Sequence, residues 1–146
     1  KYWCQAVEEY LKRLAPYAKV EINEVQEEKI AEKPSLAEIR QGLAKEGERI
    51  QKHLAPSYFV VPLAVEGKML SSEELAQFLE KLPLEWNSQV AFIIGSSHGI
   101  APEILGKGDF LLSFSPMTFP HQMVRVFLLE QIYRSYKIMK GEPYHK

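Results

Sequence analysis

The sequence lacks the features that several common kinds of site require. It holds one cysteine, Cys4, so no internal disulfide can form, and no Cys/His cluster has metal-ligand spacing. No apolar run approaches the roughly 20 residues that span a bilayer, and no signal-peptide pattern opens the chain. The glycine-rich fingerprints of dinucleotide-binding and phosphate-binding loops are also missing. We therefore expect a cytoplasmic protein with no metal and no membrane contact.

The composition describes an ordinary globular domain. The 146 residues are 46% hydrophobic and 25% charged, which suits a chain with a sizeable core. No internal repeat, low-complexity tract or linker divides the sequence, so we expect one domain over residues 1–146.

The net charge of −1 hides an uneven distribution of charges. Residues 121–146 hold two acids and five bases, namely Arg125, Arg134, Lys137, Lys140 and Lys146. A basic face on an acidic body can bind RNA, because phosphate attraction acts over about one Debye length, roughly 10 Å. On charge alone, however, the pattern is more typical of a solvated helix face.

Helical spacing and capping signals predict five helices. The first ends near Pro16 and has an apolar stripe of Trp3, Ala6, Val7, Tyr10, Leu11 and Leu14. Two more begin at capping boxes, Ser35 with Glu38 and Ser71 with Glu74. The apolar face of the first of these consists of Ile39, Leu43, Ile50 and Leu54. That of the second consists of Leu75, Phe78, Leu79 and Leu82. A short helix begins at residues 101–103, with Pro early, and a long one occupies about 121–139.

Two segments are apolar throughout, Tyr58–Val65 and Gln89–Ile94, as in strands covered on both faces. Pro62 is unusual in such a strand, because it lacks an N–H group. Lys19–Val25 alternates apolar and polar residues and predicts a half-exposed edge strand. A shorter strand is predicted at Leu111–Phe114. Strands that alternate with helices predict an α/β domain, with a mostly parallel sheet flanked by helices.

Ligands of parallel sheets bind beyond the carboxyl ends of the strands. Three loops lie there and are candidates for one pocket: Leu63–Lys68 with its turn at residues 66–68, Gly95–Gly99 and Phe114–Phe119. Gly95–Gly99 lets backbone amides approach a ligand closely, or it is a tight turn into the next helix. Phe114–Phe119 combines hydroxyls, Pro and large apolar side chains that suit an adenine. It equally suits a rigid loop that caps the last helix through Thr118 and Pro120.

The four histidines do not form a catalytic arrangement that spacing alone identifies. His53 is expected on an exposed helix face, and His98 lies in the glycine loop. His121 opens the last helix, where the positive dipole end disfavours protonation. His145 lies in the tail, and each histidine taken singly is more often structural.

Three segments taken together carry a family resemblance: FIIGSSHGIAPEI, LSFSPMTFPHQMVRVFLLEQIYRSYKI and GEPYHK. Lys45–Ile50, Leu63–Lys68 and Ser71–Leu79 follow in the same family order. The sequence thus resembles the RlmH (YbeA) family of the SPOUT superfamily over essentially its whole length. Members are bacterial methyltransferases that use S-adenosylmethionine to methylate N3 of a pseudouridine in 23S rRNA.

The resemblance implies a C-terminal trefoil knot and a homodimer, with the cofactor in the knot loops. The implied cofactor contacts are Leu63, Gly95, Ser96, Phe114, Ser115, Pro116, Met117, Thr118 and Phe119. The residues implied near the methyl group are His121, Arg125, Tyr144, His145 and Lys146.

The sequence departs from the family at two places. The family has a buried first strand before the helix in which this sequence begins, so we expect that strand to be missing and a sheet edge to be open. The usual Gly-Gly is Gly95-Ser96 here. If the second position needs a positive φ or a close cofactor, Ser96 would cost about 1 kcal/mol or obstruct binding.

Methyl transfer from a sulfonium depends on positioning, and the N3 proton must leave. The hypothesis is that His121 or His145 assists deprotonation, that Arg125 and Lys146 orient the RNA, and that Tyr144 contacts base or cofactor. An RNA- or ribosome-binding module that keeps the fold without the cofactor is the alternative, while missing motifs disfavour a generic nucleotide-binding domain.

The last helix is expected to mediate the dimer, because its apolar positions exceed one core-facing stripe. These positions are Val124, Phe127, Leu128, Ile132 and Tyr136.

Overall fold

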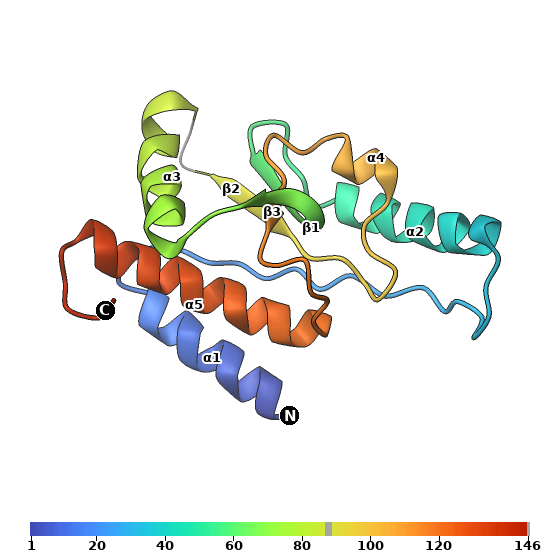
Figure 1. The fold of residues 1–146 in the computed structure, drawn as a ribbon, viewed down its shortest axis with the longest axis horizontal. Helices are drawn as coiled ribbons and strands as arrows, with labels where there is room; N and C mark the ends of the chain where they lie inside the picture. Colours follow the sequence, from blue (N-terminus) through green and yellow to red (C-terminus); the bar gives the residue numbers. More distant parts are fainter. Residues whose placement is uncertain (87–88, 146) are drawn as a thin grey trace.

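A computed structural model describes residues 1–86 and 89–145. The elements in chain order are α1 (Tyr2–Leu14), α2 (Leu36–Gln51), β1 (Phe59–Met69), α3 (Ser72–Glu85), β2 (Val90–Ile93), α4 (Pro102–Leu105), β3 (Leu112–Ser113) and α5 (His121–Met139). Figure 1 shows α2 and α4 on one side of the sheet and α1, α3 and α5 on the other. This arrangement confirms an α/β fold with helices on both sides of a small sheet.

The sheet is parallel and has the strand order β2-β1-β3. β1 pairs with β2 from Phe59↔Val90 to Pro62↔Ile93, and its pairing with β3 begins at Leu63↔Leu112. Because all three strands run the same way, their carboxyl ends meet at one edge of the sheet. The predicted parallel sheet is therefore confirmed.

Successive residues of β1 point to opposite faces of the sheet, as the period of a strand requires. Val60 packs with Ile93 and with α2 and α4, in a core that includes Leu43, Ile100, Ala101 and Ile104. Val61 packs against Leu75 of α3 and Leu112 of β3. Both faces are therefore covered, which explains why this segment is apolar throughout.

Pro62 is fully buried in the middle strand, despite its missing N–H group. The pyrrolidine ring faces Gly108, where an added Cβ would lie 2.8 Å from Cδ of Pro62. On that side the pairing with β3 starts only at Leu63, one residue later. The proline thus takes a position where the ladder does not need its N–H.

The predicted helices are confirmed, together with both capping boxes. Ser35 accepts from the backbone N–H of Glu38 and Ser71 from that of Glu74, and each glutamate accepts from its serine's backbone N–H. α5 runs from His121 to Met139, as expected from the sequence.

The predicted strand at Lys19–Val25 is wrong. Residues 18–30 form no ladder with any described strand, and Figure 1 shows them as a single trace that passes the sheet. An extended segment becomes a strand only when a neighbour satisfies its backbone groups. Here β2 is an edge strand, and a groove separates it from this segment.

The predicted turn at residues 66–68 is also wrong, because β1 continues to Met69. Leu63 and Lys68 both pair with Leu112, so the residues between them form an irregularity within the strand. Gly67 permits this, since an added Cβ would lie 2.7 Å from the carbonyl oxygen of Leu111. The turn signal therefore marks a bulge rather than a reversal of the chain.

His53, expected on a helix face, lies just beyond the end of α2.

Candidate functional site

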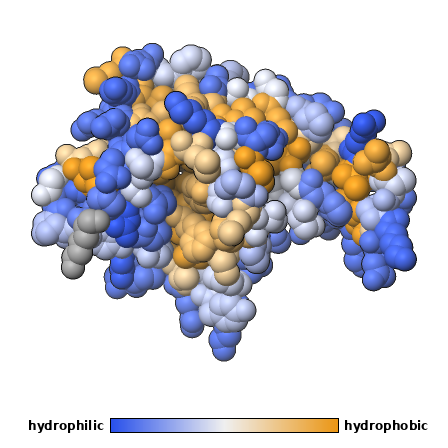
Figure 2. All heavy atoms as spheres, in the orientation of Figure 1, coloured by the Kyte–Doolittle hydropathy of each residue, from blue (hydrophilic) through white to orange (hydrophobic). Residues whose placement is uncertain are grey.

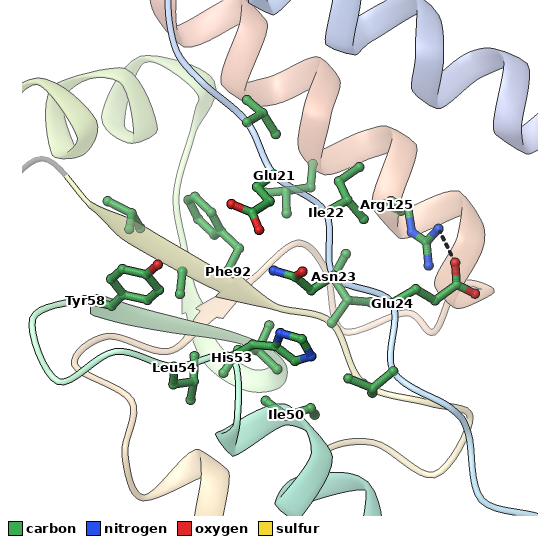
Figure 3. A pocket seen from close by; sticks show the side chains of 18 of the residues that line it. Glu21, Ile22, Asn23, Glu24, Ile50, His53, Leu54, Tyr58, Phe92 and Arg125 are labelled. Carbon is green, nitrogen blue, oxygen red and sulfur yellow. Dashed lines mark hydrogen bonds and ion pairs between the residues drawn. The ribbon is translucent and has the colours of Figure 1, made fainter.

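The described residues form a groove of about 1170 Å³ along the free edge of β2. Its walls are β2, the end of α2, one face of α5 and the segment at residues 17–27, which we call the strap. Figure 3 shows Glu21 to Glu24 of the strap across from Phe92, with Ile50 and His53 at the α2 end. Apolar residues also reach the surface in the middle of the face shown in Figure 2, between hydrophilic ends.

The groove brings together part of the predicted site. Gly95, Ser96, His121 and Arg125 line it, together with strap residues. Leu63 and the loop at residues 114–119 do not line it, nor do the described tail residues Tyr144 and His145. Lys146 lies outside the described residues.

The predicted cofactor residues nevertheless share one edge of the sheet. Leu63 pairs with Leu112 and follows Pro62, which pairs with Ile93. Gly95 follows the end of β2, and Phe114 follows the end of β3. Gly95 and Phe114 thus follow the carboxyl ends of β2 and β3, where sheets of this kind bind ligands, whereas Leu63 lies within β1, one residue beyond the partner of the last residue of β2.

The loop at residues 95–99 is a compact turn. Ser96 and Gly99 exchange two backbone hydrogen bonds, of 3.1 Å and 2.9 Å. Gly99 has φ +96°, and a Cβ at Gly95 would clash with the carbonyl oxygen of Gly99. Among the described residues only glycines have positive φ, so Ser96 is not strained as the sequence led us to expect.

The loop at residues 114–119 is held by its own side chains. The Ser115 hydroxyl accepts a 2.9 Å hydrogen bond from the backbone N–H of Met117. The ring of Phe119 contacts that of Phe127 edge to face, with centroids 5.7 Å apart. Pro120 is the N-cap of α5 and no side chain caps it, so the expected cap by Thr118 is not formed.

The tail is fixed to α5 and α3 by a hydrogen-bonded network. The Tyr144 hydroxyl donates to Glu130 at 2.7 Å, and the Arg134 guanidinium lies 4.8 Å from the Tyr144 ring centroid. Burial and the bond to Glu130 raise the pKa of Tyr144 to about 12. Arg134 contacts Nδ1 of His145 at 3.0 Å, and Nε2 of His145 lies 2.9 Å from Glu73.

These contacts define the hydrogen-bonding state of His145. Arginine has only donors, so Nδ1 accepts from Arg134, and Nε2 must carry the proton donated to Glu73. That donation is the main reason why the pKa of Glu73 lies below its ordinary value. Both nitrogens of His145 are therefore engaged within the protomer.

The tail and His121 contact different levels of α5. Tyr144 contacts Glu130, nine residues and about 14 Å along the helix axis from His121, and His145 contacts Arg134, thirteen residues and about 20 Å from it. A single protomer thus does not bring the tail together with His121 and Arg125, although the resemblance implies that these residues share a site.

The comparison with known families agrees with this architecture. Residues 1–145 match the family described as predicted SPOUT methyltransferase. The chain belongs to the SPOUT methyltransferase family. SPOUT membership indicates an S-adenosylmethionine-dependent methyltransferase, and the small parallel sheet flanked by helices fits the SPOUT fold.

The side chains of the predicted cofactor contacts are of the types that suit S-adenosylmethionine. Leu63, Phe114 and Phe119 are half-buried apolar side chains that suit an adenine ring. Ser115 and Thr118 add hydroxyls, and the nine predicted contacts include no lysine or arginine. A neutral set suits a cofactor without phosphate groups, whereas nucleotide phosphates call for cationic side chains.

The basic residues of this SPOUT chain are less available than the sequence indicates. Arg125 pairs with Glu24 at 3.4 Å, Arg134 with Glu130 at 3.1 Å and Lys137 with Glu142 at 3.3 Å. The local positive charge at residues 121–145 is thus largely balanced by neighbouring carboxylates.

The described residues contain neither a cluster of metal ligands nor a membrane-spanning helix. No group of three or more His, Cys, Asp or Glu side chains in 1–86 and 89–145 is placed to hold a metal ion. In the same part of the chain no helix is both long and apolar enough to cross a bilayer.

One buried residue of the groove was missed by the sequence analysis. Glu46 is 5% exposed and lines the groove beside Ser96. The signal was present, because Glu46 is three residues from Leu43 and four from Ile50, on the apolar face of α2. A carboxylate on such a face is rarely buried without partners.

Proposed function

We propose that the protein is a cytoplasmic, homodimeric methyltransferase that modifies N3 of a pseudouridine in the 23S rRNA of the assembled ribosome. Membership of the SPOUT methyltransferase family over residues 1–145 carries the proposal. The resemblance of the loops and tail to the RlmH family supports the choice of nucleotide. The knot implied by that resemblance belongs to the same proposal.

The cofactor would be held at the carboxyl ends of the three strands. Leu63, Phe114 and Phe119 would cover the adenine, and backbone groups around Gly95 and Ser96 would contact the remainder. S-adenosylmethionine, when bound, supplies an electrophilic methyl group on a sulfonium. The task of the protein is then to hold the nucleophile in line with that methyl group.

His121 is the better candidate for assisting removal of the N3 proton. It lines the groove and is half-buried, whereas both ring nitrogens of His145 are engaged by Arg134 and Glu73. A base must have a free nitrogen within hydrogen-bond reach of the proton that it removes. Arg125 would stabilise the negative charge that develops on the base, or it would bind an RNA phosphate. In either case its present ion pair with Glu24 would have to break.

A dimer would bring together the residues of the implied site that one protomer keeps apart. If two α5 helices pack in opposite directions about a two-fold axis, the tail of one protomer reaches His121 and Arg125 of the other. Phe127 and Met117 are 39% and 72% exposed near the start of α5, and such apolar surface suits an interface. Tyr144 and His145 would then close the partner's site, with Lys146 beside them.

Methyl transfer to purified assembled ribosomes from labelled S-adenosylmethionine tests the proposal. The wild type should label 23S rRNA at N3 of a pseudouridine, and His121→Ala and His145→Ala should each lose most of the activity. Lys52→Ala, at an exposed position that does not line the groove, should remain active and serves as the control. Unlabelled rRNA with the wild-type protein would contradict the proposed substrate.

Mixing the two inactive variants tests the shared site. Random exchange makes half of the dimers mixed, and each mixed dimer has one site with both histidines, so about a quarter of the wild-type rate should return. If the mixture stays inactive while exchange is demonstrated, His121 and His145 do not act across the dimer.

A further inference from the structure

Glu46 is the one charged side chain that is buried among the described residues, and the catalytic proposal does not use it. It lies on α2, where it is 5% exposed between Leu43 and Gly47. A carboxylate removed from water must be compensated by hydrogen bonds. Its two oxygens therefore show which groups the fold has arranged around it.

Each oxygen of Glu46 accepts one hydrogen bond, and the two donors belong to different segments. Oε1 accepts from the Ser96 hydroxyl at 2.8 Å, and Oε2 accepts from the backbone N–H of Glu28 at 2.8 Å. Arg49, one turn further along α2, pairs with the Glu28 carboxylate at 2.8 Å. α2 thus holds both the glycine loop and the chain that continues from the strap.

The contact with Ser96 fixes more than one side chain. Ser96 and Gly99 exchange backbone hydrogen bonds, and Gly95 fits against the Gly99 carbonyl with no space for a Cβ. The turn at residues 95–99 is therefore closed by its own backbone, and the Ser96 hydroxyl connects it to α2 through Glu46.

We propose that Glu46 is a positioning residue that sets the affinity for S-adenosylmethionine by holding the turn at residues 95–99 through the Ser96 hydroxyl. The inference rests on the proposed function, since it assigns that turn to the cofactor. It predicts that the glutamate and the serine act as a pair. Removing either one should release the turn in the same way.

Calorimetric titration with S-adenosylmethionine, alongside thermal unfolding, tests this inference in the full chain. Glu46→Ala and Ser96→Ala should each weaken cofactor binding about tenfold, because each deletes a hydrogen bond to a charged group. The double variant should be no weaker than Glu46→Ala, as expected for partners in one interaction. Glu48→Ala, an exposed glutamate of the same helix, is the matched control and should bind normally.

Glu46→Gln tests whether the hydrogen bonds of Glu46, rather than its negative charge, hold the turn, because glutamine has nearly the same size and no charge. The amide oxygen can accept from Glu28, and the amide nitrogen can donate to Ser96, whose hydroxyl is able to accept. This variant should therefore recover binding close to that of the wild type. If Glu46→Ala does not fold, Ser96→Ala and Glu46→Gln carry the test.

Two results would overturn the inference and are distinguishable. A lower unfolding temperature with unchanged cofactor affinity in Ser96→Ala and Glu46→Ala would mean that Glu46 is only structural, with the proposed function intact. Absence of binding by the wild type would remove the proposed function and this inference together.

Discussion

Gly95 is a residue at which the fold and the proposed cofactor site both require the absence of a side chain. An added Cβ would clash with the Gly99 carbonyl oxygen and lie 2.8 Å from Cγ1 of Ile100. Ile100 is buried in the core beside α2 and α4, so the turn has no space to retreat.

We expect Gly95→Ala to lower the free energy of unfolding by about 1–3 kcal/mol, the usual cost of overpacking, and to abolish cofactor binding. Urea unfolding and calorimetry measure the two effects. Gly106→Ala is the control, because its nearest neighbour would lie at an ordinary 3.4 Å. Equal effects of the two substitutions would contradict this account of the turn.

Tyr144 gives the tail a pH dependence on the alkaline side. Its pKa is raised from 10.0 to about 12, mainly by burial and then by its bond to Glu130. A raised pKa favours the neutral phenol in the folded state. The stabilisation is therefore complete below about pH 10 and disappears as the pH rises to about 12.

The ultraviolet absorbance of the phenolate, as the difference between wild type and Tyr144→Phe, measures this titration. Glu130→Gln should bring the midpoint back toward 10, because a neutral acceptor no longer disfavours the phenolate. An ordinary tyrosine midpoint in the wild type would show that the tail is not held against Glu130 in solution.

At the residue scale, contacts between neighbours in the sequence could be predicted, whereas contacts between distant residues could not. Both capping boxes were predictable, because Ser71 and Glu74 lie within one helical turn. The pairing of Glu46 with Ser96 was not, since 50 residues separate them. The backbone strain expected at Ser96 is absent, because Gly99, not Ser96, has the positive φ.

At the scale of elements, α3 links the sheet to the tail. Its N-terminal turn carries Glu73, which accepts the hydrogen bond from His145. The Ser72 hydroxyl of the same turn donates to Gln131 of α5 at 2.6 Å. The start of α3 must therefore be well formed for the tail to stay in place.

We expect Ser71→Ala to destabilise the protein by about 1 kcal/mol, since it removes the N-cap of α3. Ser71→Asp should be nearly neutral, because aspartate caps equally well. Urea unfolding measures both, and hydrogen exchange of Tyr144 and His145 should increase only in the alanine variant. Unchanged stability in Ser71→Ala would show that this cap does not contribute.

The elements that sequence patterns predicted well are those with local causes. α5 and both capped helices appear where expected, because spacing and capping act within a few residues. Lys19–Val25 has the alternation of a strand but lacks a paired neighbour, which no local pattern can supply. The turn at residues 66–68 became a bulge because Gly67 approaches β3, a contact that depends on the sheet.

At the scale of the whole molecule, the apolar side chains of α5 that exceed one core-facing stripe make more than one kind of contact. Leu128, Ile132 and Tyr136 line the groove, while α1 and α3 pack on the helix from other sides. Tyr10 of α1 contacts Tyr133 with ring centroids 6.3 Å apart. The surplus that predicted a dimer is thus partly used within the protomer, and Phe127 at 39% exposure remains for a partner.

The layers and the parallel sheet could be predicted because apolar runs alternate with amphipathic ones. The knot stays a prediction from family resemblance, because a knot depends on the path of the whole chain and is rare among proteins, so spacing does not indicate it. The candidate cofactor residues came from family resemblance, and the structure adds that Gly95 and Phe114 follow the ends of β2 and β3, the two strands on either side of the one that holds Leu63.

The central claim is that S-adenosylmethionine binds at this sheet edge, and a titration followed by ¹⁵N–¹H NMR tests it most directly. The claim predicts saturable shifts of the backbone amides of Leu63, Gly95, Ser96 and residues 114–119, with little change in α1. Shifts confined to the strap and the α2 end of the groove, or no shifts, would contradict it. No shifts at all would favour an RNA- or ribosome-binding module that keeps the SPOUT fold without its cofactor.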